Sequence, residues 1–164
     1  MRRVFIAITL VFLFTVSACV QDHEPSFFPE EIENILTGFE TAAWQVDAII
    51  ENGNRINLSE CEKATLLVFY RTNEAFELID VEPFCNSTGG VIDSGTWEVK
   101  VNEQTNDRRL TLSYDESINL TYQIDLITPF RLRLVRTIRN GESNSQEILE
   151  YVRVEFEEEE EESN

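Results

Sequence analysis

The chain has 164 residues, of which 31 are acidic and 13 are lysine or arginine, so its formal net charge is −18 at pH 7. That length corresponds to one domain and is sufficient to bury a hydrophobic core. A surface this acidic repels phosphate backbones and anionic lipid headgroups, which excludes nucleic acid as a partner.

The N-terminus has the layout of an export signal. Arg2 and Arg3 precede an apolar run over residues 4–16 that is too short to span a bilayer, and small residues follow. The stretch Val16-Ser17-Ala18-Cys19 resembles a bacterial lipobox, which implies removal of residues 1–18 and a lipid on the Cys19 sulfur. The alternative is a plain secretory signal in which Cys19 lies near the cleavage site by chance.

Lipidation of Cys19 would decide where the protein works. Cleavage removes two arginines and no acid, so the formal charge becomes −20, and attachment to a membrane must come from the acyl chains. We therefore expect a cell-envelope protein anchored in the outer membrane, on its periplasmic or surface-exposed face. Residues 19–28 would form a tether. Its stretch Gln21-Asp22-His23-Glu24 resembles an acidic sorting patch of surface lipoproteins, and a solvated linker is the alternative.

The two remaining cysteines predict a disulfide. Cys61 and Cys85 are an even pair in an oxidising compartment, and joining them closes a loop of about 25 residues, a stabilisation of roughly 3–4 kcal/mol. The alternative is two free buried thiols. The sequence has no CxxC spacing and no histidine near either cysteine, which argues against zinc or thioredoxin-like chemistry.

One short helix is predicted over residues 29–36, with Gly38 after its end. Proline and acids occupy its first turn, and its apolar residues recur at helical spacing at Ile32, Ile35, Leu36 and Phe39. We expect this apolar face to close one end of the structure that follows.

From Thr41 onward the apolar residues recur every second position, which predicts eight strands joined mostly by tight turns. The first strand places Trp44, Val46, Ala48 and Ile50 on one face. The others are expected over residues 64–71, 75–81, 96–101, 109–114, 118–127, 130–138 and 146–156.

The alternation also predicts which side chains face inward. In the strand over 118–127 the expected inward set is Ile118, Leu120, Tyr122, Ile124 and Leu126, and in the last strand it is Val152, Val154 and Phe156. Strands with one apolar and one polar face belong to antiparallel sheets, and eight of them can close into a barrel. We predict an all-β fold over residues 29–156, an eight-stranded antiparallel up-and-down barrel with one short N-terminal helix. A β-sandwich also fits the alternation, although the tight turns favour the barrel.

The chemistry of the chain points away from catalysis. Its single histidine, His23, lies in the tether, and no nucleophile, phosphate-loop, dinucleotide or zinc-protease motif is found. A glycosidase needs two acids in a cleft, and the expected inward face carries almost none. The acidic run in the tail, residues 157–164, lacks the spacing of a calcium loop, so we expect a disordered tail. We expect no enzyme, cofactor or metal.

Aromatic residues on the expected inward face suggest a ligand pocket. Trp44, Phe69, Trp97, Tyr122 and Phe130 are predicted to line it and to bind a small hydrophobic molecule. The alternative is that these residues fill the barrel as an ordinary core.

The chain resembles the lipocalin-like domains of bacterial lipoproteins over residues 34–156. The resemblance rests on a helix end at Leu36-Thr37-Gly38, the first-strand Trp44, the spacing of Cys61 and Cys85, and Gly95-Thr96-Trp97 before an alternating strand. It departs from the family in lacking a glycine shortly before Trp44. The resemblance implies a barrel that binds a small apolar molecule. The alternative is a structural or protein-interaction lipoprotein with a filled barrel that contacts another envelope protein.

Overall fold

The computed structural model describes residues 28–85, 88–114, 118–141 and 143–155 of the chain. The predicted export signal, Cys19, most of the tether, and the acidic tail lie outside these residues. Within the described ranges, no helix is long and apolar enough to cross a membrane.

Helix α2 spans Pro29–Thr37 and follows the predicted start and stop signals. Proline occupies the first turn, where its missing N–H leaves no hydrogen bond unmade. Glu31 accepts a hydrogen bond from the Phe28 N–H at 3.0 Å. Gly38 ends the helix in the left-handed conformation at φ 59°, which glycine adopts without strain.

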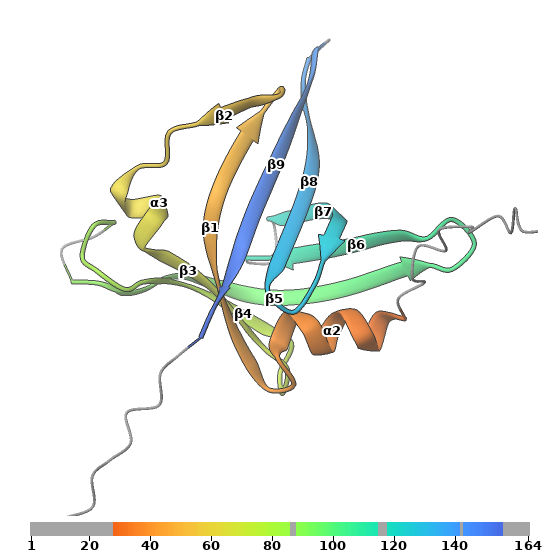
Figure 1. Ribbon diagram of the computed structural model, residues 1–164, viewed down its shortest axis with the longest axis horizontal. Coiled ribbons are helices and arrows are strands. Elements are labelled where there is room, and N and C mark those ends of the chain that lie inside the picture. Colours follow the sequence, from red (N-terminus) through yellow and green to blue (C-terminus); the bar gives the residue numbers. More distant parts are fainter. Residues whose placement is uncertain (1–27, 86–87, 115–117, 142, 156–164) are drawn as a thin grey trace, which may run out of the picture.

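The apolar side of α2 closes one end of the barrel, as expected (Figure 1). Ile32 and Leu36 are fully buried there. Phe39, which the helical spacing assigns to the same face, is instead 75% exposed with φ 82°. That assignment is wrong because the chain has already left the helix at Gly38.

Eight antiparallel strands form a meander in which the last strand pairs with the first, so the predicted eight-stranded barrel is confirmed. A short additional strand, β2, pairs with the end of β1. The strands are β1 (Thr41–Glu51), β2 (Asn54–Ile56), β3 (Thr65–Tyr70), β4 (Ala75–Asp80), β5 (Gly90–Asn102), β6 (Asp107–Ser113), β7 (Asn119–Ile127), β8 (Arg131–Asn140) and β9 (Ser143–Val154).

A second helix, α3, was not expected and spans Glu60–Ala64 just before β3. Ser59 caps it, since its hydroxyl accepts a hydrogen bond from the Glu62 N–H at 3.2 Å, and the Glu62 carboxylate accepts one from the Ser59 N–H at 2.7 Å. This reciprocal arrangement is a capping box, and its Ser-x-x-Glu signature is present in the sequence.

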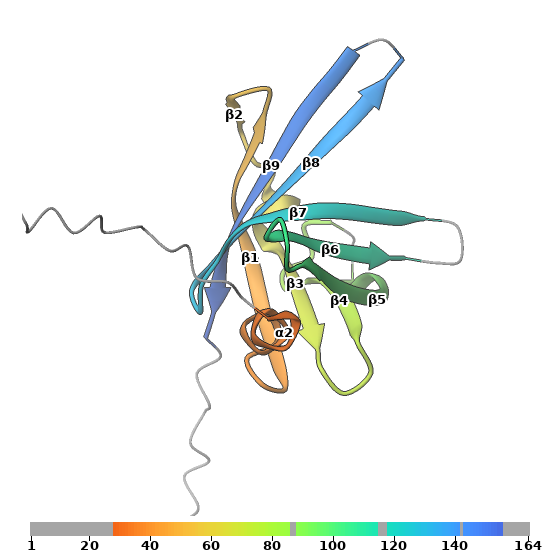
Figure 2. The ribbon, with the colours of Figure 1, turned by 90° about the vertical axis from the view of Figure 1, so that its right-hand side faces the viewer.

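The strands separate at the end of the barrel opposite α2. β1 pairs with β3 only over Thr41–Gln45, and its last three residues pair with β2 instead. β7 pairs with β8 only from Gln123 onward. Figure 2 shows β8 and β9 diverging from β6 and β7. The barrel is therefore covered by a helix at one end and open at the other.

An irregularity in β1 reverses the expected alternation. The pairing of β1 with β9 shifts between Val46 and Ala48, where one extra residue is inserted. Ile49 consequently lines the interior. The prediction that Ala48 and Ile50 share the inward face of Trp44 is therefore wrong.

A similar irregularity occurs in β7, between Ile124 and Leu126. Beyond it Ile127 is buried at 3% exposure, whereas Leu126 is 39% exposed. The predicted inward position of Leu126 is wrong for the same reason.

The predicted faces of β9 are inverted. Tyr151 lines the interior, so the alternation turns Val152 and Val154 outward. Val154 packs against Ala43 in a small apolar cluster on the outer face. Because both faces of β9 carry apolar residues, a period of two does not distinguish the inner face. Phe156 lies outside the described residues.

Candidate binding cavity

The open half of the barrel contains a cavity of about 250 Å³. This is below the lower limit of roughly 300 Å³ typical of drug-sized pockets, yet larger than an apolar cavity of about 150 Å³ that holds benzene. Most of its wall is aliphatic, so it suits a small and largely apolar molecule. The lining residues are Val46, Ile49, Glu62, Thr65, Leu67, Leu78, Ile92, Leu149 and Tyr151.

Three of the predicted pocket residues fill the closed half of the barrel, next to α2. Trp44 donates its indole N–H to the Leu36 carbonyl at 2.9 Å, and Trp97 donates to the Tyr70 carbonyl at 3.2 Å. Phe69 meets Trp97 edge to face, with ring centres 5.9 Å apart. These side chains form a solid core there, and the cavity is lined by other residues.

Phe130 does not face the interior. It lies in the turn between β7 and β8 and is 66% exposed. The sequence-based assignment is wrong because the inward alternation of β8 begins at Leu132, which is 1% exposed.

An ion pair lies on the inner face of the open half. Arg136 and Glu147 are opposite each other on β8 and β9, one alternation step beyond the inward pair Leu134 and Leu149. The distances from Arg136 Nη2 and Nε to Glu147 Oε2 are 2.7 and 3.0 Å. The guanidinium carbon also lies 5.3 Å from the centre of the Tyr122 ring, a cation–π contact.

Three tyrosines lie within electrostatic range of this ion pair, and Tyr122 is in contact with it. Burial raises the pKa of Tyr122 to about 12 and raises the pKa of Tyr114 and Tyr151 as well. Each of the three also feels the charge of Arg136, so the groups lie within electrostatic range of one another. We name Tyr114, Tyr122, Arg136, Glu147 and Tyr151 the interior polar cluster.

A family model for the lipocalin-like domain matches residues 41–134, from β1 into β8. The chain belongs to the lipocalin-like domain family. Comparison with curated proteins finds no match. The matched part of this lipocalin-like barrel supplies the cavity wall from β1, β3, β4 and β5. Leu149 and Tyr151, on the closing strand, complete the wall beyond the matched residues.

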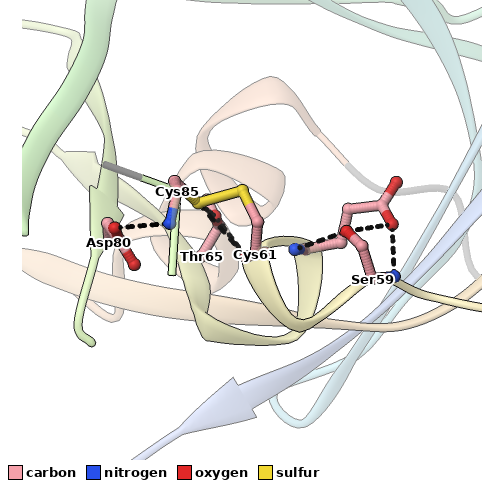
Figure 3. Close-up of a disulfide and its surroundings, with 6 residues drawn as sticks. Ser59, Cys61, Thr65, Asp80 and Cys85 are labelled. Carbon is pink, nitrogen blue, oxygen red and sulfur yellow. Dashed lines mark hydrogen bonds between the residues drawn. A yellow bond between two sulfur atoms is a disulfide. The ribbon is translucent and has the colours of Figure 1, made fainter. Parts of the chain in front are cut away.

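A disulfide joins Cys61 to Cys85 in this lipocalin-like barrel, which confirms the predicted pairing (Figure 3). It ties α3 to the segment after β4. Thr65, part of the cavity wall, donates a hydrogen bond to the Cys61 carbonyl at 2.8 Å. The buried Asp80 carboxylate accepts one from the Cys85 N–H at 2.9 Å. The disulfide therefore holds α3 against the cavity wall.

The same helix places a carboxylate beside the cavity. Hydrogen bonds from the Ser59 backbone and hydroxyl lower the pKa of Glu62, so this carboxylate is charged at neutral pH. Glu62 is one of the lining residues, and it gives the cavity wall a negative charge. Among the described residues, no group of three or more metal-ligating side chains could hold a metal ion.

Sequence reasoning missed the ion pair of the interior polar cluster, although the signal was present. Leu132 and Leu134 establish the inward face of β8, and the next step of the same alternation is Arg136. Its partner Glu147 could not be assigned to the inner face from the sequence, because both faces of β9 carry apolar residues. In the structure, Glu147 and Leu149 lie on the same inner face, opposite Arg136 and Leu134.

Proposed function

We propose that the protein is a non-catalytic binder of a small hydrophobic molecule, held in the cell envelope by a lipid on Cys19. The observation that carries the binding function is the apolar cavity of about 250 Å³ in the open half of the lipocalin-like barrel. Its lining residues Val46 and Ile49 lie beyond Gln45, where β1 no longer pairs with β3, whereas the closed half is packed with aromatic side chains. This division supports a barrel that admits a ligand at one end only.

Binding is tested with N-phenylnaphthylamine, an uncharged fluorescent probe that brightens in apolar surroundings. We expect saturable binding by the native protein at micromolar concentration. Replacing Ile49, which lines the cavity, by tryptophan is expected to weaken binding at least about tenfold, or about 1.4 kcal/mol, because the larger ring fills the space.

The matched control is Ile50→Trp, one position along β1 and on the opposite face. We expect it to bind the probe as the native protein does. Absence of saturable binding by the native protein would contradict the proposed function, as would equal losses in the two variants.

The anchor is tested by growing cells with labelled palmitate. The resemblance to a lipobox at Val16-Ser17-Ala18-Cys19 supports label on the protein and its recovery with the outer membrane. Cys19→Ser is expected to abolish the label and release the protein from the membrane. An unlabelled native protein that is secreted freely would refute anchoring, and it would leave the binding function standing.

A further inference from the structure

We propose that the ligand is an amphipath with an uncharged, hydrogen-bonding head, such as a hydroxyl group, whose tail occupies the cavity and whose head contacts the interior polar cluster. This inference rests on the proposed function and names the class of molecule that the cavity selects.

The cluster and the apolar wall are continuous along β9. Glu147, Leu149 and Tyr151 follow one another on its inner face, and Leu149 and Tyr151 line the cavity. Two residues of a strand span about 7 Å, so the ion pair lies one alternation step from the aliphatic wall. A molecule whose tail fills the cavity can therefore reach the ion pair with its head.

The ion pair is polar but carries no net charge. Both contacts from Arg136 go to the same oxygen of Glu147, Oε2. A guanidinium has five N–H donors and a carboxylate has two accepting oxygens, so the pair retains both donors and acceptors for a further group. The side chains of Arg136 and Glu147 are only 24% and 15% exposed, which limits how much water can satisfy them.

The neighbouring tyrosine adds a hydroxyl to the same place. Tyr122 is 5% exposed and stacks its ring on Arg136. A protonated phenol both donates and accepts, and so does an alcohol head. An uncharged head with the same dual character would satisfy this site without leaving a buried group unpaired.

Charged heads fit the cluster poorly. A carboxylate head that contacts Arg136 must also approach Glu147, and an ammonium head that contacts Glu147 must approach Arg136. Moving an ion out of water without a full counter-charge is strongly unfavourable. Anions are opposed further by Glu62 in the cavity wall and by the net charge of −18.

The first experiment compares three probes with the same eight-carbon tail, namely octanol, octanoate and octylammonium, in calorimetry on the native protein. We expect octanol to bind about tenfold more tightly than either ion. Octanoate or octylammonium binding as tightly as octanol would overturn the inference. If none of the three probes binds although N-phenylnaphthylamine does, the inference is also overturned, and the proposed function stands. If N-phenylnaphthylamine does not bind either, the proposed function is contradicted as well.

The second experiment changes the charge of the cluster. Glu147→Gln leaves Arg136 without its counter-charge, so we expect octanoate to bind at least about tenfold more tightly than it does to the native protein. Glu150→Gln is the matched control, because Glu150 pairs with Arg133 on the outer face of the same two strands at 2.5 Å. We expect it to leave octanoate binding unchanged. No gain in Glu147→Gln, or an equal gain in the control, would overturn the inference.

A double variant keeps the test decisive if Glu147→Gln does not fold. Replacing Arg136 and Glu147 together by methionine removes both charges and retains apolar volume, a change that proteins often tolerate. We expect octanol to bind about tenfold more weakly, because its hydroxyl would be buried without the ion pair as partner. Octanol binding equal to that of the native protein would contradict a head-binding role for the cluster.

Discussion

Replacing Tyr122 by phenylalanine isolates the effect of one buried hydroxyl on stability at high pH. Tyr122 is 5% exposed, and burial raises its pKa from 10.0 to about 12, with Tyr114 and Glu147 adding to the rise and Arg136 opposing it. An unfolded chain releases this proton near pH 10, whereas the native chain retains it. The stability that Tyr122 contributes is therefore fully present below pH 10. It declines above pH 10 and is lost as the pH rises through about 12.

The size of this loss follows from the shift in pKa. One pKa unit corresponds to about 1.4 kcal/mol, so Tyr122 accounts for a loss of about 3 kcal/mol in total. By linkage, the native protein has lost roughly 1 kcal/mol of this free energy of unfolding at about pH 11. Tyr122→Phe keeps the buried ring and lacks the titrating group. At neutral pH we expect its stability to lie within about 1 kcal/mol of the native value.

The assay is urea unfolding of both proteins at neutral pH and at about pH 11, followed by tryptophan fluorescence. We expect the free energy of unfolding of Tyr122→Phe, relative to that of the native protein, to be roughly 1 kcal/mol higher at about pH 11 than at neutral pH. Both proteins share the other titrating groups, so taking the difference between the two proteins at each pH cancels the effect of those groups on the free energy of unfolding. An unchanged difference at the two pH values would refute the reasoning, since it would mean that Tyr122 ionises alike in the folded and unfolded chains.

Further predictions concern the contacts that hold the barrel together. Replacing Cys61 and Cys85 by serine is expected to lower the free energy of unfolding by about 2–4 kcal/mol, and alkylation of either cysteine in the unreduced native protein would contradict the disulfide. Gly95→Ala is expected to destabilise the protein by about 1–3 kcal/mol in thermal melts, because a Cβ there would clash with the Ser113 carbonyl oxygen. A melt like that of the native protein would exclude this clash. Trp44→Phe is expected to cost about 1–3 kcal/mol in urea unfolding, since it removes the buried hydrogen bond to α2, and no loss would show that this bond does not stabilise the barrel.

The fold was predictable because the strongest signals were local. A proline, acids and a terminal glycine bound α2, and regular alternation identified the eight strands of the barrel. The errors in β1 and β7 arose where one inserted residue changed the face of a strand. Nothing in the residue types marks the irregularity before Ala48 in β1 or the one before Leu126 in β7, because either register leaves apolar side chains on the inner face.

The binding site was less predictable for a different reason. Large apolar residues on an inward face predict a pocket wall, yet their size is what allows Trp44, Phe69 and Trp97 to fill the closed half. The cavity lies where smaller aliphatic side chains meet between diverging strands. How far the strands diverge depends on long-range pairing, which a single sequence does not reveal.

The closing pairing of the barrel joins its first and last strands. β9 bonds to β8 on one side and to β1 on the other, from Ala43 opposite Val154 to Glu51 opposite Glu147. A chain still emerging from the ribosome therefore cannot complete the barrel until residue 154 is free. Until then β1 and β8 present open edges to other chains, which is a hazard for aggregation.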